Sequence, residues 1–268
     1  SKDIAAVERL FARRSTRLDR AQVVVRPILE EVKKKGDRAL VKYAKQLDGL
    51  EKSSVRVSSA RLTEARASLP ASLVSAVDVA SRQIRLFAEK QMPKSWSKTF
   101  GRGVSLGQIV RPLDSVAAYI PGGRYPLPST LMMTVIPAQI AGVRTISAAS
   151  PGPSLETLGV ADYMGVENFF HMGGAQAIAA FAFGTETVPR ADRIVGPGNI
   201  YVAAAKKLLA GTVGIDFVAG PTEILIIAVD GNPKHIAADM LAQAEHDVDA
   251  AAILLTTSRR LASKVQRE

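Results

Sequence analysis

Apolar residues recur at three- and four-residue spacing in the N-terminal part of the chain, which is the spacing of one face of an α-helix. Residues 22–47 show the pattern with a break at Gly36-Asp37, and residues 71–91 repeat it. We therefore predict two amphipathic helices within residues 22–47 and another helix over residues 71–91. Residues 92–107 are polar and contain glycine, so a hairpin or loop is expected there, with Trp96 as a packing anchor.

The pattern changes from Val116 onward to short apolar runs of strand length, each followed by a glycine-bearing turn and then by an alanine-rich stretch. Strands are predicted at residues 115–120, 145–149, 168–172 and 193–195, and helices at residues 129–141, 155–165, 175–183 and 200–210. A strand at 223–229, a helix at 233–246 and a strand at 250–255 follow. Repeated strand, turn and helix are typical of a parallel sheet with helices on its faces.

The fold class predicted by this order is α/β: Rossmann-like parallel sheets with helices on both faces, in two domains plus N-terminal helices. Residues 1–118 are expected to form the N-terminal helices and the first part of domain 1, and residues 119–221 an inserted Rossmann-like domain. Residues 222–268 then return to domain 1. A length of 268 residues, 47% of them hydrophobic, is enough to bury the core that such a fold needs.

The formal net charge of +10 raises the question of a nucleic-acid partner. Residues 1–111 hold 24 Lys and Arg against 11 Asp and Glu, whereas residues 112–268 hold 11 against 14. The basic excess is interleaved with acids, as in Glu30-Glu31 before Lys33-Lys34-Lys35, which is typical of a solvated helix face. Because the sequence shows no aromatic stacking platform and no zinc-finger spacing, we expect no nucleic-acid partner.

Cysteine is absent, so the chain has no disulfide and no thiolate metal site, and we expect a reducing, cytoplasmic location. Any metal must bind nitrogen or oxygen ligands. The most apolar runs, at residues 131–140 and 224–229, are much shorter than the roughly 20 residues of a membrane helix, so no membrane partner is expected. Because the chain starts with Ser1 and ends within a predicted helix, we expect it to be an excerpt of a longer protein.

Glycine turns between a strand and a helix allow the backbone to approach a phosphate, and the helix N-terminus offers unpaired N–H groups. Tyr119, Gln176 and Asn199 stand at or just beyond the carboxyl ends of predicted strands, the edge at which open α/β sheets bind ligands. The turns at Gly173-Gly174 and Gly196-Pro-Gly198 lack the full G-x-G-x-x-G spacing. On the residues alone, these positions are either nucleotide contacts or ordinary turn residues and helix caps.

Gln243 and His246 are three residues apart and share one face of a predicted helix. An amide oxygen and a neutral imidazole nitrogen can both bind Zn²⁺. A histidine near a helix C-terminus is also a favourable partner of the helix dipole, so a metal site and a structural role are both open. His171 and His235 have no comparable neighbours in the sequence, and we expect both to be structural or exposed.

Five spaced motifs resemble those of histidinol dehydrogenases, in the same order and with similar spacing over nearly the whole chain. They are Tyr119-Ile-Pro-Gly-Gly123, Gly173-Gly-Ala-Gln-Ala-Ile-Ala179, Gly196-Pro-Gly-Asn199, Ala219-Gly-Pro221 and Gln243-Ala-Glu-His246. The resemblance implies a family of homodimers that oxidise L-histidinol through the aldehyde to L-histidine, with two NAD⁺ used in sequence and one bound zinc ion.

The resemblance also implies site residues, position by position. The residues that match the family's NAD⁺ contacts are Tyr119, Gln176 and Asn199. Thr222 stands where the family commonly has a substrate-contacting serine, and Gln243 and His246 match two zinc ligands that also border the substrate. In that arrangement the zinc holds the amine and imidazole nitrogens of histidinol, and NAD⁺ accepts hydride from the carbinol carbon.

The family's Glu-His acid/base pair, an aspartate ligand and a further histidine ligand have no counterpart in this chain. Glu245-His246 belongs to the earlier zinc motif and is not that pair. A zinc site normally needs at least three protein ligands, so two from this chain predict weak binding. We therefore expect the chain alone to be inactive and a complete parent protein to be active.

Two other interpretations are open. A relative with the same fold, NAD⁺ site and zinc would oxidise a different small polar alcohol, such as a sulfonated diol, and Thr222 in place of serine is compatible with that. In the other, the chain is a naturally short, non-catalytic nucleotide-binding or scaffold protein. An assay with L-histidinol distinguishes the dehydrogenase of another alcohol from the leading interpretation. The reading frame after Glu268 distinguishes the naturally short protein, because a stop codon there would favour it.

Overall fold

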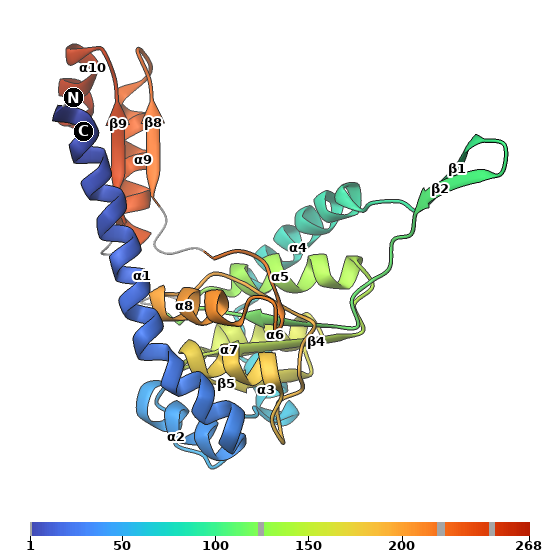
Figure 1. Cartoon of the computed structure of the whole chain (residues 1–268). Helices are drawn as coiled ribbons and strands as arrows, with labels where there is room; N and C mark the ends of the chain where they lie inside the picture. The colour runs from blue at the N-terminus through green and yellow to red at the C-terminus, as the bar shows by residue number, and fades with distance from the viewer. Residues whose placement is uncertain (1, 123–125, 219–222, 247–249) are drawn as a thin grey trace. The chain divides into compact units, whose positions relative to one another are not determined.

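The computed structural model describes residues 2–122, 126–218, 223–246 and 250–268, and it describes only the backbone of residues 2–16 and of His246. The chain divides into two compact units, residues 1–218 and residues 219–268 (Figure 1). Among the described residues, no helix combines the length with the apolar character that a membrane crossing requires.

A five-stranded parallel sheet forms the centre of the first unit. Its strands are β3 (Ser115–Tyr119), β4 (Thr145–Ser150), β5 (Asn168–His171), β6 (Arg193–Val195) and β7 (Gly214–Ile215). The spatial order is β5-β4-β3-β6-β7, and every neighbouring pair is parallel. The chain therefore reverses its direction across the sheet between β3 and β6. The carboxyl ends of these two strands frame the crevice where open α/β sheets bind ligands.

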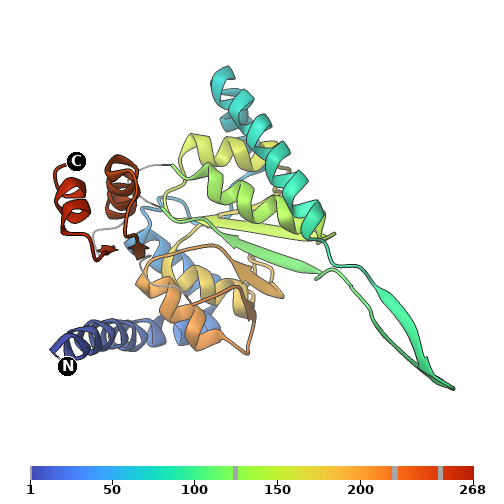
Figure 2. The same ribbon diagram turned by 90° about the horizontal axis from the view of Figure 1, so that it is seen from above.

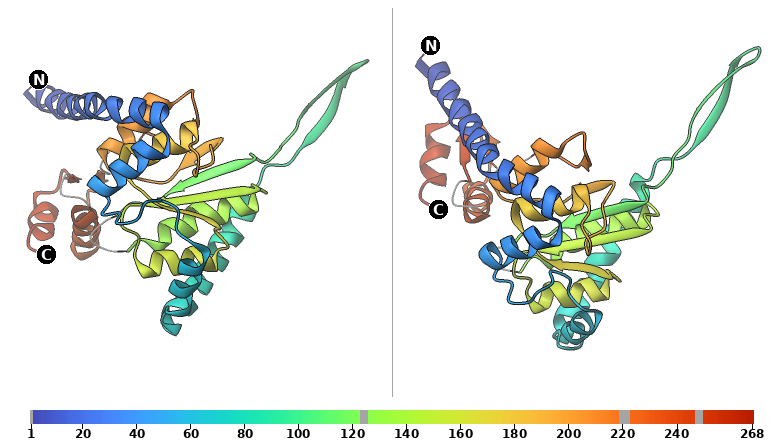
Figure 3. Two further views of the ribbon diagram at one scale, coloured as in Figure 1. Left: turned by 90° about the horizontal axis from the view of Figure 1, so that it is seen from below. Right: turned by 60° about the horizontal axis from the view of Figure 1, so that its bottom comes forward.

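Helices cover both faces of this sheet, as predicted (Figure 3). One face carries α5 (Pro128–Ile140) and α6 (Leu155–Tyr163), with α3 (Ser59–Ala67) packed on α6 and α4 (Ala71–Gln91) packed on α5. The other face carries α7 (Gly174–Phe183) and α8 (Ile200–Leu209), with α1 (Lys2–Lys35) packed on both. A further helix, α2 (Asp37–Leu47), follows α1 and contacts α7.

The strands contribute to two separate cores, because successive side chains of a strand point to opposite faces of the sheet. On β3, Ala117 and Tyr119 belong to the core shared with α7 and α8, whereas Ala118 belongs to the core shared with α5 and α6. On β5, Phe170 lies on the first side and Phe169 on the second. Since both faces are buried, the strands have continuous apolar runs rather than an alternating pattern.

The two helices predicted within residues 22–47 are confirmed, with the break at the expected place. The first ends at Lys35, and Gly36 joins it to α2 with a φ of 52°. This first helix begins at Lys2, far earlier than predicted, because charged residues obscure the apolar spacing in its N-terminal half. The apolar spacing does not predict α3, since only Leu62 and Ala65 of its nine residues are buried.

A hairpin or loop is predicted for residues 92–107. Most of this segment forms a hairpin, which projects from the first unit (Figure 2). Its strands, β1 (Trp96–Gly101) and β2 (Val104–Gln108), are antiparallel, and all of their residues are exposed. The prediction that Trp96 anchors the packing is wrong, because 51% of its surface is accessible. Tryptophan is highly buried on average, but this one lies in a strand that buries none of its residues.

The second unit contains β8 (Ile224–Ile227), α9 (Pro233–His246), β9 (Ala252–Leu255) and α10 (Arg259–Val265). The two strands pair in parallel, and the strands and helices share a small core around Ile236 and Leu261. The predicted strand, helix and strand of residues 223–255 are therefore confirmed. That these residues complete a domain begun by residues 1–118 stays a prediction, as do the boundaries at residues 118 and 221.

Phe181 tests the core on the α7 side of the sheet. It is 0% exposed and meets Phe170 edge to face, with ring centroids 6.0 Å apart. We expect Phe181→Ala to lower the free energy of unfolding, measured by urea denaturation, by about 3–5 kcal/mol because it leaves a cavity. Phe100→Ala is the matched control, since that side chain is 58% exposed on β1. Its loss should change the same quantity by less than about 0.5 kcal/mol, and equal effects would contradict this assignment of the core.

Candidate functional site

The turns that follow four of the strands meet at the carboxyl edge of the five-stranded sheet. Gly122 and Gly173 both lie against Pro151: a Cβ on Gly122 would be 2.7 Å from the Pro151 carbonyl oxygen, and one on Gly173 would be 2.4 Å from the Pro151 Cβ. Gly196 has a φ of 112°, and a Cβ there would be 2.1 Å from the carbonyl oxygen of Tyr119. Glycine is therefore required at these positions by the close approach of one turn to another.

Tyr119 ends β3 and is buried, with 2% of its surface exposed. Its hydroxyl accepts a hydrogen bond from the Gly174 N–H at 3.1 Å. Burial raises the pKa of the phenol to about 12, so the hydroxyl is protonated at neutral pH. Tyr119 thus connects the end of β3 to the first residue of α7.

Sequence reasoning missed Asp48, which is the C-cap of α2 and reaches the turn between β5 and α7. Its Oδ2 accepts hydrogen bonds from the Gly173 N–H at 2.8 Å and from Gln176 Nε2 at 3.0 Å. Burial raises the pKa of the Asp48 carboxyl group, and these two hydrogen bonds oppose the shift. No spacing pattern signals this residue, because Asp48 and Gly173 are 125 residues apart in the sequence.

Gln176 lies in the first turn of α7, with 1% of its surface exposed. Its Nε2 is bonded to Asp48, so the amide oxygen faces away from the carboxylate. That oxygen, Oε1, is buried, and no described residue donates a hydrogen bond to it. Gly174 borders it, since a Cβ on Gly174 would lie 2.9 Å from Oε1. The edge therefore holds an unpaired acceptor beside a residue that has no side chain.

Asn199 is exposed and caps α8 at the turn that follows β6. Its Oδ1 accepts hydrogen bonds from the N–H groups of Tyr201 at 3.0 Å and Val202 at 3.1 Å. Capping uses the amide oxygen, so the amide NH₂ is the part of the side chain that is left to contact a ligand. The structure shows the helix cap, and a nucleotide contact through Nδ2 stays a prediction.

An ion pair between a buried lysine and a partly buried aspartate holds the turn that contains Gly196. Lys206 in α8 is 2% exposed and donates to the Gly196 carbonyl oxygen and to Asp216 Oδ1, both at 2.6 Å. The other oxygen of Asp216 accepts from the Gly196 N–H at 2.8 Å. Burial lowers the pKa of Lys206, and its hydrogen bond with Asp216 opposes the shift. Both backbone groups of Gly196 are thus fixed by side chains from other elements.

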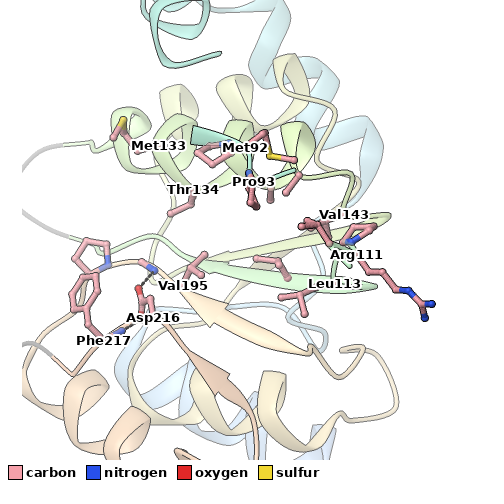
Figure 4. Close-up of a pocket in the computed structure, with 18 of the residues that line it drawn as sticks. Met92, Pro93, Arg111, Leu113, Met133, Thr134, Val143, Val195, Asp216 and Phe217 are labelled. Atoms are coloured by element: carbon pink, nitrogen blue, oxygen red, sulfur yellow. Dashed lines mark hydrogen bonds between the residues drawn. The ribbon is translucent and has the colours of Figure 1, made fainter. Parts of the chain in front are cut away.

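A cavity of about 880 Å³ lies between α5 and the face of β3 and β6 (Figure 4). Its lining is mostly apolar and includes Leu113, Val116, Met133, Val143 and Val195. Asp216 also lines it, but none of the three predicted NAD⁺ contacts does. Gly196 and Pro197 of the turn after β6 line the cavity as well. The cavity therefore adjoins the carboxyl edge at this turn, but not at Tyr119, Gln176 or Asn199.

The residues predicted to bind metal or substrate are Thr222, Gln243 and His246, and all three come after the first unit in the sequence. Gln243 is half-buried in α9, and His246 is the last residue of that helix, so the two are three residues apart on one helix, as predicted. The side chain of His246 and the whole of Thr222 lie outside the described residues. Among the residues that the structure does describe, no three His, Cys, Asp or Glu side chains are grouped so that they could hold a metal ion. The zinc-ligand and substrate roles therefore stay predictions.

Comparison with known proteins identifies the family. The family model described as histidinol dehydrogenase matches residues 11–268. The chain belongs to the histidinol dehydrogenase family. The histidinol dehydrogenase of Aquifex aeolicus is 49% identical over 247 residues, which are 91% of this chain and 58% of that protein. The histidinol dehydrogenase of Halalkalibacterium halodurans is 46% identical over 260 residues, 94% of this chain and 61% of that protein.

A solved structure gives the same result. The crystal structure of histidinol dehydrogenase from Elizabethkingia anophelis matches with a TM-score of 0.85 and 38% identity, covering 92% of this chain and 58% of that one. The predicted α/β class is thus confirmed as that of a histidinol dehydrogenase. The chain spans about 58–61% of the length of these relatives.

In this member of the histidinol dehydrogenase family, the residues predicted to contact NAD⁺ lie at one edge of the sheet. Tyr119 and Gln176 are brought together around Gly174, which donates to the first and borders the amide oxygen of the second. Asn199 occupies the neighbouring turn, which meets Tyr119 through the close contact of Gly196. The sequence motifs therefore identify the turns, and the structure adds the side chains that hold them.

Lys206 and its neighbour Lys207 test the ion pair below the Gly196 turn. Lys206→Met should lower the free energy of unfolding by about 2–3 kcal/mol, because it removes the two hydrogen bonds of the ammonium and leaves the partly buried Asp216 without its charged partner. Lys207→Met is the control: its side chain is 46% exposed and its ammonium lies 3.8 Å from Asp19, a pair worth less than about 1 kcal/mol. Thermal or urea denaturation of both variants measures the difference. A Lys206→Met protein as stable as the Lys207→Met protein would contradict the role of the ion pair.

Proposed function

We propose that the complete protein containing this chain is a zinc-dependent, NAD⁺-linked enzyme that oxidises L-histidinol to L-histidine in the last steps of histidine biosynthesis. The observation that carries the proposal is the family match over residues 11–268. Relatives with 46–49% identity that bear the name histidinol dehydrogenase support it. A cytoplasmic homodimer, and inactivity of the 268 residues alone, belong to the same proposal.

The carboxyl edge of the sheet fits a dinucleotide. Gln176 presents a buried amide oxygen that no described residue pairs, and Gly174 leaves the adjoining space without a side chain. Asn199 has an amide NH₂ that is not used in capping α8. Tyr119 is buried, so its part is to hold the Gly174 N–H through its hydroxyl. NAD⁺ supplies the hydride acceptor for the carbinol carbon of the substrate, and these residues bind and orient it.

The zinc is proposed from the donor types in α9. Gln243 and His246 offer an amide oxygen and an imidazole nitrogen one helical turn apart, and zinc accepts both kinds of ligand. The described residues do not by themselves make a zinc site. We attribute the remaining ligands, and the acid/base pair of the reaction, to parts of the complete protein outside them.

An assay of the complete protein with L-histidinol and NAD⁺ tests the proposed reaction. We expect NADH to form, detected by its absorbance, with L-histidine as the product. A small sulfonated diol, tested in parallel, should give no NADH. Oxidation of the diol but not of histidinol would replace the proposed substrate. NAD⁺ binding without oxidation of either alcohol would favour a non-catalytic nucleotide-binding protein.

Metal content tests the two proposed ligands. Gln243→Ala and His246→Ala in the complete protein should lower zinc affinity by at least the roughly 10–100-fold that outer-shell changes cost, and turnover should fall with it. His235→Ala is the matched control, because His235 is an exposed histidine near the start of the same helix. Elemental analysis after dialysis measures the zinc retained. Full zinc retention in the Gln243 and His246 variants would contradict their role as ligands.

A further inference from the structure

Asp48 has a fixed place beside the Gln176 amide. Its Oδ2 accepts hydrogen bonds from both the Gly173 N–H and Gln176 Nε2, at 2.8 Å and 3.0 Å. The backbone of Asp48 is held on both sides: its N–H donates to the Ala44 carbonyl oxygen at 2.9 Å, and its carbonyl oxygen lies 2.8 Å from His171 Nε2. The carboxyl group is therefore positioned by α2 and by the end of β5.

The chemistry of the two side chains determines which way the amide points. An ionised carboxylate only accepts hydrogen bonds, whereas an amide has one donating end and one accepting end. Gln176 therefore turns its NH₂ toward Asp48 and its oxygen away from it. That oxygen is buried, and no described residue donates to it. An unpaired buried acceptor is unfavourable, and a ligand that supplies a donor would remove the penalty.

The group that meets this oxygen is not a phosphate. The Gly173 N–H already donates to Asp48, and the Gly174 N–H donates to the Tyr119 hydroxyl, so neither is left to bind an anion. An amide oxygen and a carboxyl group stand where a phosphate needs donors. Binding of a phosphate is one role that a glycine turn before a helix can have, and these two N–H groups do not offer it here. An uncharged donor fits instead, such as a ribose hydroxyl or the NH₂ of a carboxamide or of adenine.

We propose that Asp48 is a positioning residue of the nucleotide site, which fixes the Gln176 amide so that Oε1 accepts a hydrogen bond from a ribose hydroxyl or an amino group of NAD⁺. The inference rests on the proposed function, because it takes NAD⁺ to bind at this edge. The accepting oxygen of Asp48, rather than its charge, orients the amide. Asparagine can replace it, since its Oδ1 can accept the same two hydrogen bonds, whereas alanine cannot.

The dissociation constant of NAD⁺, measured by calorimetry on the complete protein without histidinol, tests the positioning role. Asp48→Ala and Gln176→Ala should each raise it about tenfold, the effect of one lost hydrogen bond. Asp48→Asn should raise it by less than about threefold, because the conservative variant keeps the acceptor. The double variant should bind no more weakly than Gln176→Ala, because Asp48 acts through that side chain. A purely structural role would shift only the unfolding temperature.

Nucleotide analogues test the same contact without any change at Asp48. Acetylpyridine adenine dinucleotide lacks the carboxamide NH₂, nicotinamide hypoxanthine dinucleotide lacks the adenine amino group, and deoxyribose analogues each lack one hydroxyl. One of these analogues should bind about tenfold more weakly than NAD⁺ to the wild-type protein. The same analogue and NAD⁺ should bind equally well to Gln176→Ala, which has already lost the acceptor.

The outcomes separate this inference from the proposed function. Absence of NAD⁺ binding by the wild-type protein overturns the proposed function and this inference with it. Equal binding by Asp48→Ala and wild type, or effects of the two single variants that multiply in the double variant, overturns the positioning role alone. If Asp48→Ala does not fold, the analogues decide, and the inference is wrong when none of them loses affinity.

Discussion

The two hydrogen bonds that Asp48 accepts fix the turn that follows β5 at the carboxyl edge of the five-stranded sheet. They connect the end of α2 to the turn between β5 and α7, and they give partners to the Gly173 N–H and to the Gln176 NH₂. The turn after β6 is held in a similar way, by Lys206 and Asp216. In both places a partly or fully buried charged side chain fixes the backbone of a glycine that has no side chain to anchor it. The geometry of the turns therefore depends on residues that lie in other elements.

The regular elements of the first unit are predictable because both faces of its sheet are buried. The strands β3 to β6 appear as apolar runs, and the helices between them begin after glycine or proline turns, so predicted and observed bounds agree closely. Two elements have too few buried residues for their apolar spacing to predict them: β7 has only two residues, and α3 buries two of its nine. The burial of Trp96 is wrongly predicted for a different reason. Its size and apolarity favour burial, but its position in an exposed hairpin prevents it.

The candidate site is predictable only where position along a strand determines it. Tyr119 and Gln176 stand next to strand ends, and parallel strands bring those ends to one edge. Asp48 approaches the same edge from 125 residues away, so no local pattern could indicate it. The direction in which the Gln176 amide points depends on Asp48, so the sequence does not indicate it either. The motifs shared with histidinol dehydrogenases suggest roles for the edge residues, but the hydrogen bonds determine which chemical groups those residues can present.

The position of β6 in the sheet also determines the order in which the unit is assembled. Its residues pair with β3, Val116 opposite Arg193, on the side of β3 that faces away from β4 and β5. Pairing between such distant segments slows folding, because a long loop must close before the contacts form. As the chain is synthesised, β3, β4 and β5 can associate before β6 has left the ribosome. The crevice between β3 and β6 forms only when the segment through Asp216 is present, so a nascent chain acquires three of the five strands of its sheet before that crevice is complete.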